Sequence, residues 1–258
     1  MIIDHIRDLF ERTRSRHRTA DLGRLESNLD AFLAGKKLVS PHALQRPPFW
    51  YQGLRDAPWH ARDELAAVEV LERSYPIIRR ELEQLLAPRD RFQQFRGGDP
   101  AMMNEYIKGD WTVFYFKDEF AQPSDQEYIA RNRKRAPATA AMLDALPRLG
   151  ETAFFAVLDP GTHLKPHFGA ENLRLFVHLG VIVPDGCGIR VGGEQATWQE
   201  GRCLVFDDSF EHEAWNFGAA SRTILLVEFW HPDLNDAEVE FFKALSPIIR
   251  DNPGLLSA

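Results

Sequence analysis

The chain has 258 residues, of which 44% are apolar and 27% charged, a composition typical of a globular protein with a sizeable core. Its net charge of −7 argues against nucleic acid as a partner, because phosphate binding needs a basic face. No uncharged apolar run is long enough to span a membrane, and acids mix with bases too early for a secretory signal. We therefore expect a soluble, cytoplasmic protein with no membrane partner.

The first 37 residues predict an amphipathic helix. Apolar side chains recur at the spacing of one buried stripe, at Ile2, Ile3, Ile6, Leu9 and Phe10. Such a helix docks either on its own domain or on a second copy of the chain. A homodimer through the N-terminal helices is therefore one expectation.

Two further segments precede the first strand. Residues 38–59 are too rich in proline for a helix and too apolar for a free linker, so we expect an ordered wrap along the surface. Residues 61–87 have helical periodicity. Pro76 lacks an amide hydrogen, and we expect it to kink this helix or to start a new one.

The middle of the chain predicts one strand and two short helices. Residues 110–118, "DWTVFYFKD", have strand composition. The helices that follow should divide at Pro137. Their basic cluster "RNRKR" at 131–135 is more typical of a solvated helix face than of a site for an acidic ligand.

From residue 152 the periodicity changes from helical to extended. Short apolar runs follow one another, separated by Asp, Gly and Pro, which is typical of an antiparallel sandwich or closed barrel. A last helix should open after Asn235, a plausible cap. The runs are "TAFFAVL", "RLFVHLGVIV", "GIRVGG", "ATWQ", "RCLVF", "HEAWNF" and "RTILLVEFW".

The two cysteines, Cys187 and Cys203, form no CxxC pattern and cannot make a disulfide framework. We expect both to be buried thiols.

Five of the nine histidines lie in the strand-rich half, and two of them stand out by their context. His167 follows a proline and precedes small residues, where a strand would end. His212 comes where an apolar strand has run into a cluster of acids. On facing strands of a jelly-roll barrel two imidazoles can bind one metal, although ligand type alone leaves iron, zinc, copper and nickel open.

Several linked motifs then resemble a known family. The stretches "HLKPHFGAENLRLFVHLGVIVP", "CGIRVGGEQATWQEGRCLVFDDSFEHEAWN" and "FWHPDL" closely resemble the aspartyl/asparaginyl β-hydroxylases, which are Fe(II)- and 2-oxoglutarate-dependent oxygenases. The likeness is dense over residues 152–234, with a fainter echo in "FWYQGLRDAPW" and "GDWTVFYF". The resemblance implies a double-stranded β-helix (a jelly-roll, cupin-like barrel), mainly β with flanking helices.

The resemblance also implies a division of the chain. Residues 1–109 would be an N-terminal helical extension that packs on the barrel. Residues 110–234 would be the catalytic core, and 235–258 a C-terminal helix.

For the metal, the resemblance implies that His167 and His212 are the two protein ligands of Fe(II) and therefore catalytic. Gly169 stands where related oxygenases have a carboxylate ligand, so water should complete the site. Asp208 and Glu171 remain alternative carboxylates, because acids lie near both histidines.

For the organic ligands, the resemblance implies three more residues. Arg222 would pair with the far carboxylate of 2-oxoglutarate, a bidentate task that suits a guanidinium. His178 would border the same co-substrate, and Arg174 would be a catalytic residue that receives the acidic side of the substrate.

The sequence departs from the better-known members at two positions. Phe176 stands where a second arginine helps to hold 2-oxoglutarate, and Ala156 where a hydroxyl assists. The co-substrate must be held differently. Trp198 and Trp215 are more typical of barrel packing than of a cofactor stack.

The two remaining histidines of this half have other expected roles. We expect His231 to fix a chain turn, whereas His163 is a weaker candidate for a supporting contact to the metal site.

The implied activity, with O2 as the oxidant, is hydroxylation at the β-carbon of an aspartyl or asparaginyl residue, or of a free or carrier-bound amino acid. The substrate would be a small molecule or peptide bearing a carboxylate or amide. Two alternatives stay open: a lipid acyl-chain hydroxylase of the same fold, and a non-catalytic jelly-roll module that binds metal or a small acid.

Overall fold

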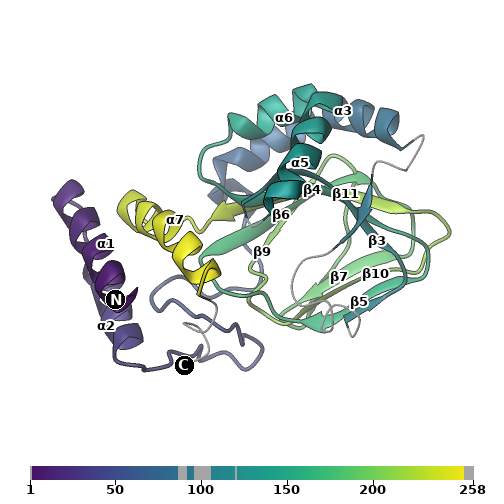
Figure 1. The fold of residues 1–258 in the computed structure, drawn as a ribbon. Coiled ribbons are helices and arrows are strands. Elements are labelled where there is room, and N and C mark those ends of the chain that lie inside the picture. The colour runs from purple at the N-terminus through teal and green to yellow at the C-terminus, as the bar shows by residue number, and fades with distance from the viewer. Residues whose placement is uncertain (1, 87–91, 96–105, 120, 253–258) are drawn as a thin grey trace.

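The computed structural model describes residues 2–86, 92–95, 106–119 and 121–252. Two antiparallel sheets face each other, and helices cover the outside of only one of them (Figure 1). Residues 253–258 of the expected C-terminal segment lie outside the described part. No described helix is both long and apolar enough to cross a membrane.

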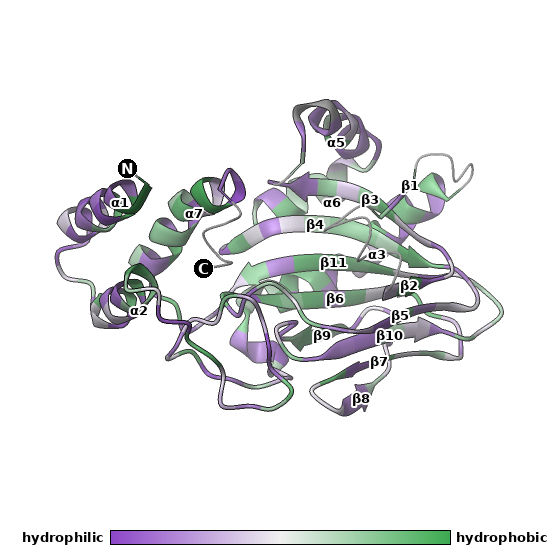
Figure 2. Ribbon diagram, turned by 60° about the horizontal axis from the view of Figure 1, so that its bottom comes forward, coloured by the Kyte–Doolittle hydropathy of each residue, from purple (hydrophilic) through white to green (hydrophobic). Residues whose placement is uncertain are grey.

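The larger sheet carries most of the apolar strands. Its order is β1-β3-β4-β11-β6-β9. Figure 2 shows β4, β11 and β6 in the colour of hydrophobic residues, whereas β8 and β10 of the other sheet are largely hydrophilic. The bounds are β1 (Gln93–Gln94), β3 (Trp111–Asp118), β4 (Leu149–Leu158), β6 (Arg174–Ile182), β9 (Cys203–Phe206) and β11 (Arg222–Trp230).

The smaller sheet has the order β2-β5-β10-β7-β8. From β4 to β7 the chain changes sheet at every strand, and it changes again from β8 to β9, β10 and β11. This alternation confirms the predicted jelly-roll. The bounds are β2 (Ile107–Lys108), β5 (Thr162–His167), β7 (Cys187–Val191), β8 (Glu194–Ala196) and β10 (His212–Asn216).

Residues of β6 alternate between two environments. Leu175, Val177 and Leu179 pack in the core beneath the helices. Phe176 packs in the second core, between the two sheets. His178 lies on the same face of the strand as Phe176, because successive side chains of a strand point to opposite faces.

Three helices cover the outer face of the larger sheet: α3 (Ala66–Leu85), α5 (Pro123–Arg135) and α6 (Pro137–Asp144). The break between α5 and α6 falls at Pro137 as predicted. Pro76 lies inside α3 and does not start a new helix, and the kink, the other expected outcome, stays a prediction. Leu71 and Ile78, on either side of it, are both fully buried in one core, and this packing offsets the cost of about 3 kcal/mol for an interior proline.

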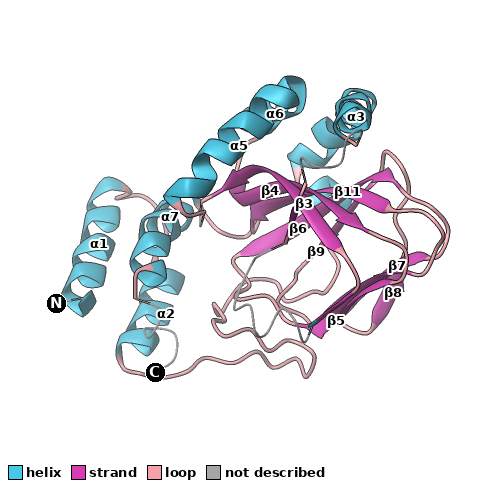
Figure 3. Ribbon diagram, turned by 45° about the vertical axis from the view of Figure 1, so that its right-hand side comes forward, coloured by secondary structure: helices cyan, strands magenta, loops and turns pink. Residues whose placement is uncertain are grey.

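A second helical layer stands beside the barrel: α1 (Ile2–Arg16), α2 (Gly23–Leu33) and α7 (Asp236–Arg250) (Figure 3). The N-terminal stretch forms two helices where the pattern predicted one. Ile6 and Phe10 are buried, and Phe10 packs edge-on against Phe241 of α7, whereas Ile2 and Ile3 are exposed. The stripe therefore docks on the chain's own last helix.

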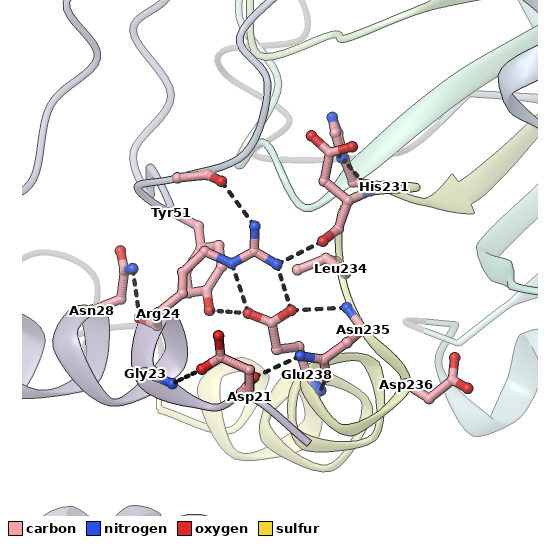
Figure 4. A network of polar contacts seen from close by, with 12 residues as sticks. Asp21, Gly23, Arg24, Asn28, Tyr51, His231, Leu234, Asn235, Asp236 and Glu238 are labelled. Carbon is pink, nitrogen blue, oxygen red and sulfur yellow. Dashed lines mark hydrogen bonds and ion pairs between the residues drawn. The ribbon is translucent and has the colours of Figure 1, made fainter. Parts of the chain in front are cut away.

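Glu238 links α7 to α2 (Figure 4). Its side chain is fully buried and forms an ion pair with Arg24. Tyr51 donates a hydrogen bond to the same carboxylate at 2.6 Å. Asn235 caps α7 as predicted, accepting from the Glu238 backbone N–H at 2.9 Å.

Residues 38–59 form the expected ordered wrap. The backbone N–H of Phe49 donates to Ala170, and Leu44 accepts from Glu211. The short 3-10 helix η1 (Arg62–Glu64) then leads into α3. The wrap lies against the loops next to the two candidate metal ligands, because Ala170 closely follows His167 at the end of β5 and Glu211 precedes His212 at the start of β10.

Candidate functional site

His167 and His212 lie side by side at one end of the barrel. His167 is the last residue of β5 and His212 the first of β10, and the two are register partners. Their ring centroids are 4.1 Å apart. Residues 45 positions apart in the sequence are thus brought together by the pairing of two strands.

Both imidazoles are held through the same ring nitrogen. Nδ1 of His167 lies 2.7 Å from the Lys165 carbonyl oxygen, and Nδ1 of His212 lies 2.9 Å from that of Phe210. A carbonyl only accepts, so each Nδ1 carries the hydrogen and each Nε2 keeps a lone pair. This is the tautomer that binds a metal through Nε2.

Burial keeps both rings neutral. It lowers the pKa of His167, and together with the neighbouring His167 it lowers the pKa of His212 to about 3. Neutral imidazole is the metal-binding form. Within the described residues no third His, Cys, Asp or Glu joins them in a metal-binding group.

Gly169 and Asp208 share one space beside His167. A Cβ added to Gly169 would fall within the Asp208 carboxylate. Glu171, the other alternative carboxylate, instead accepts from Arg174 Nε at 2.7 Å. The atoms nearest to a Cβ at Gly169 all belong to the Asp208 carboxylate. Burial raises the pKa of Asp208 well above its ordinary value, and Asp207 and Glu171 add to this rise.

Arg222 lies at the opposite end of the barrel interior. It opens β11 and is only 2% exposed. Its Nε and Nη1 are buried and have no hydrogen-bond partner among the described residues. Burial lowers its pKa to about 9. A buried guanidinium without an acid is costly, and an anionic ligand would satisfy it.

His178 lies on the same inner face, between these two ends. It is buried, and neither ring nitrogen has a partner among the described residues. Its ring centroid lies 4.8 Å from that of Phe206, whose ring is 6.1 Å from that of His212. Burial lowers the pKa of His178 well below its ordinary value, and the neighbouring Arg222 and His212 lower it further.

These features fit a metal bound together with a dicarboxylate. Two imidazole Nε2 atoms are available at one end of the interior, and an unpaired guanidinium lies at the other. A diacid such as 2-oxoglutarate offers one carboxylate to each end. The donor set therefore suits the pair of ligands that the family resemblance implies.

Arg174 is surrounded by acids. Its guanidinium pairs with Glu151, with Glu171 at 2.7 Å and with Glu228 at 3.6 Å. Its charge also lies over the Trp230 ring at 5.5 Å. Although burial alone would lower the pKa of Arg174, the three glutamates raise it well above the ordinary value.

Arg174 is therefore not an open cation in this structure. A substrate carboxylate would have to displace one of the glutamates. Burial also raises the pKa of Glu228 to about 7, against the opposing effect of Arg174, so this carboxyl group can be neutralised near neutral pH.

The remaining candidates lie elsewhere. His163 pairs with Glu213 at 2.7 Å on the outer face of the smaller sheet, away from His212. Trp215 shares that outer face, where its indole covers Gly188. His231 is buried and accepts from the Asp233 backbone N–H at 3.1 Å, in the turn-fixing role expected of it.

Pattern reasoning did not find the residues that surround the candidates. Glu151 and Glu228 are far from Arg174 in the sequence, and the sequence indicates Glu171, three residues before Arg174, only as an alternative metal ligand. Trp198, expected as packing, lies under Arg222 with the guanidinium 4.4 Å from its ring centroid. A tryptophan in a strand-rich stretch gives no sign of such a partner.

Fold and site together define the class: a jelly-roll protein with a candidate metal site and a candidate anion site in one interior. The chain belongs to the aspartyl/asparaginyl β-hydroxylase family, whose model matches residues 72–232. It is 34% identical over 233 residues to aspartate beta-hydroxylase domain-containing protein 2 of Homo sapiens. It is 36% identical over 199 residues to the human aspartyl/asparaginyl beta-hydroxylase.

A third relative has a different name. The chain is 36% identical over 178 residues to the ornithine lipid ester-linked acyl 2-hydroxylase of Rhizobium tropici. The three alignments cover 86%, 74% and 68% of this chain. They span 60%, 25% and 58% of the respective relatives.

Proposed function

We propose that this protein is an Fe(II)- and 2-oxoglutarate-dependent hydroxylase. The observation that carries the proposal is the pair His167 and His212, with adjacent rings and both Nδ1 atoms held by carbonyls. The unpaired, buried Arg222 and the family membership support it.

In this proposal each residue has a limited task. His167 and His212 hold the metal through Nε2, and Arg222 neutralises the far carboxylate of 2-oxoglutarate. Asp208 or water completes the metal site. The bound iron, 2-oxoglutarate and O2 supply the oxidising chemistry that hydroxylates an unactivated C–H bond. The chain supplies orientation and a buried interior that excludes water.

His178 has a role that its environment supports. Because burial keeps this ring neutral, it presents one donor and one acceptor to the co-substrate. Phe176 and Phe206 form an apolar wall between His178 and the metal ligands.

The first substrate candidate is an aspartyl or asparaginyl residue, or a free or carrier-bound amino acid, hydroxylated at the β-carbon. Arg174 would align its carboxylate or amide. The membership of the family supports this candidate.

A second candidate is favoured by Arg174. Three glutamates already balance the charge of this residue, which is therefore not free to receive a substrate carboxylate. An acyl chain would need no free cation at this end. The ornithine lipid ester-linked acyl 2-hydroxylase of Rhizobium tropici is as similar in sequence to this chain, at 36% identity, as the human aspartyl/asparaginyl beta-hydroxylase is.

Turnover tests the proposal against a module that only binds. Protein prepared anaerobically with Fe(II) and 2-oxoglutarate should form succinate when air is admitted, whereas the His167→Ala variant should not. Absence of succinate in the wild type, with and without candidate substrates, would leave a binding module as the better account.

Product analysis separates the substrates. The protein should add one oxygen atom to one class among aspartyl and asparaginyl peptides, free amino acids and acyl lipids, as detected by mass spectrometry. Oxygen in an acyl chain and not at a β-carbon would reverse our order of preference.

A further inference from the structure

Trp198 lies in the segment between β8 and β9 and is only 3% exposed. The Arg222 guanidinium is 4.4 Å from its ring centroid. Its ring is also nearly parallel to that of His178, with an interplanar angle of 24° and centroids 6.1 Å apart. Trp198 thus contacts both residues that face the candidate co-substrate.

The indole N–H of Trp198 is buried and has no hydrogen-bond partner among the described residues. Buried tryptophan N–H groups normally find an acceptor, and those of Trp111 and Trp230 also lack one among the described residues. Trp198 differs from these two because it contacts Arg222, whose Nε and Nη1 are unpaired as well. Three donor nitrogens on two residues in contact therefore lack acceptors.

Within the described residues, no acid compensates the charge of these donors. Burial lowers the pKa of Arg222, and the Cys187 thiol, which raises it, is too weak to offset burial. A ligand that satisfies this group must therefore accept hydrogen bonds and carry negative charge. A carboxylate has two oxygens with about four lone-pair sites, more than one guanidinium occupies.

Ala156 increases the need for another donor. It lies on the neighbouring strand β4 and packs in the same core as Trp198, but its methyl group cannot donate a hydrogen bond. The indole N–H can supply what this side chain lacks.

We propose that Trp198 is a co-substrate-binding residue, whose ring orients the Arg222 guanidinium and whose N–H donates to the far carboxylate of 2-oxoglutarate. This inference rests on the proposed function and adds a residue to it. It also separates two contributions: ring stacking on Arg222 and hydrogen bonding to the ligand.

Two substitutions at one position divide these contributions. Trp198→Phe keeps an aromatic face under Arg222 and removes the N–H, while Trp198→Leu removes both. Trp215→Phe is the matched control, because Trp215 lies on the outer face of the smaller sheet. Melting temperatures and circular dichroism establish that each variant is folded.

The measurement is the Kd of 2-oxoglutarate by calorimetry, with Mn(II) as a redox-stable metal. Trp198→Phe should weaken binding about tenfold or more, since a hydrogen bond to a charged group is lost. Trp198→Leu should weaken it further. The Kd of Mn(II) alone should stay within about twofold in both variants, and Trp215→Phe should match the wild type.

Tryptophan fluorescence gives a second readout, which is independent of calorimetry. Adding 2-oxoglutarate to the wild-type Mn(II) protein should change its tryptophan fluorescence, and this change should persist in Trp215→Phe but vanish in folded Trp198→Phe. Wild-type affinity in both Trp198 variants would overturn this inference and leave the proposed function intact. A wild type that binds no 2-oxoglutarate would overturn both.

Discussion

Gly169 is a glycine because a neighbouring carboxylate fills the place of its side chain. The Asp208 side chain occupies the position that a Cβ would take. Gly169→Ala should therefore lower the free energy of unfolding by about 1–3 kcal/mol through overpacking. Urea unfolding of the metal-free protein measures this difference.

The double variant identifies the cause. Asp208→Ala added to Gly169→Ala should recover most of the loss, because the two side chains compete for one space. If the two effects simply add, the loss in Gly169→Ala has another origin, and Asp208 is not what excludes a side chain there.

The candidate metal ligands could be found from the sequence, whereas the acids around Arg174 could not. His167 and His212 have telling local contexts, and they match motifs of a family. Glu151 and Glu228 meet Arg174 only because β4, β6 and β11 are neighbours in the sheet, whereas Glu171 lies three residues before Arg174, in the loop ahead of β6. Such a cluster depends on register, which no local pattern specifies.

At the scale of elements, one buried carboxylate joins α2, the wrap and α7. Glu238 is fully buried and pairs with Arg24 and Tyr51 (Figure 4). Removing one partner of a buried ion pair typically costs about 3–5 kcal/mol, so Glu238→Gln should destabilise the protein by about 3 kcal/mol near neutral pH. Glu240→Gln, on the exposed face of α7, should cost less than about 1 kcal/mol.

The effect of Glu238→Gln should depend on pH in a defined direction. Although burial alone would raise the pKa of Glu238, its hydrogen bonds from Arg24 and Tyr51 lower it below the ordinary value of 4.5. The stabilisation is therefore present above that value and is lost as the pH falls through the lower, folded-state pKa. Chemical unfolding of the wild type and Glu238→Gln from about pH 7 to about pH 3 should show that the difference between their free energies of unfolding becomes smaller. A constant difference would mean that the Glu238 charge is not what stabilises these contacts.

Helix α3 forms despite an interior proline, because its packing on the core outweighs the free-energy cost of the proline. Pro76 is exposed, and its ring removes one helical hydrogen bond. Pro76→Ala should raise the free energy of unfolding by about 1–3 kcal/mol, seen as a higher melting temperature, while Arg80→Ala should change it by less than about 0.5 kcal/mol. A lower melting temperature for Pro76→Ala would show that α3 needs the proline to lie against the sheet.

Apolar periodicity predicted most elements and missed those that mix polar residues. It predicted the strands that are buried on both faces, such as β4 and β11. It gave no apolar run for β5, "THLKPH", which is held by pairing with β10 despite its polar residues; only the context of His167 predicted that a strand ends there. The run "ATWQ" predicts a strand, but β8 ends at its first residue, Ala196. The chain then turns inward, and Trp198 packs against Arg222.

At the scale of the molecule, the jelly-roll explains why distant motifs form one site. His167 and His212 lie on the paired strands β5 and β10 of the smaller sheet, and the buried Arg222 lies on β11 of the larger sheet. Strand spacing and turn residues could predict the fold class, and the family resemblance narrowed it to this barrel. The sequence could not predict that the apolar stripe of α1 docks on α7 of the same chain, because amphipathic periodicity shows that a helix has a buried face but not which element covers it. The homodimer stays a prediction.

The central claim is that His167 and His212 hold one iron ion to which 2-oxoglutarate binds. The most direct measurement is an anaerobic titration of the protein with Fe(II) and 2-oxoglutarate, followed by visible absorption. We expect one iron per chain and a charge-transfer band that requires both ligands, and we expect the band to be lost in His212→Ala. A wild type that shows no band, or a His212→Ala variant that keeps it, would contradict the account.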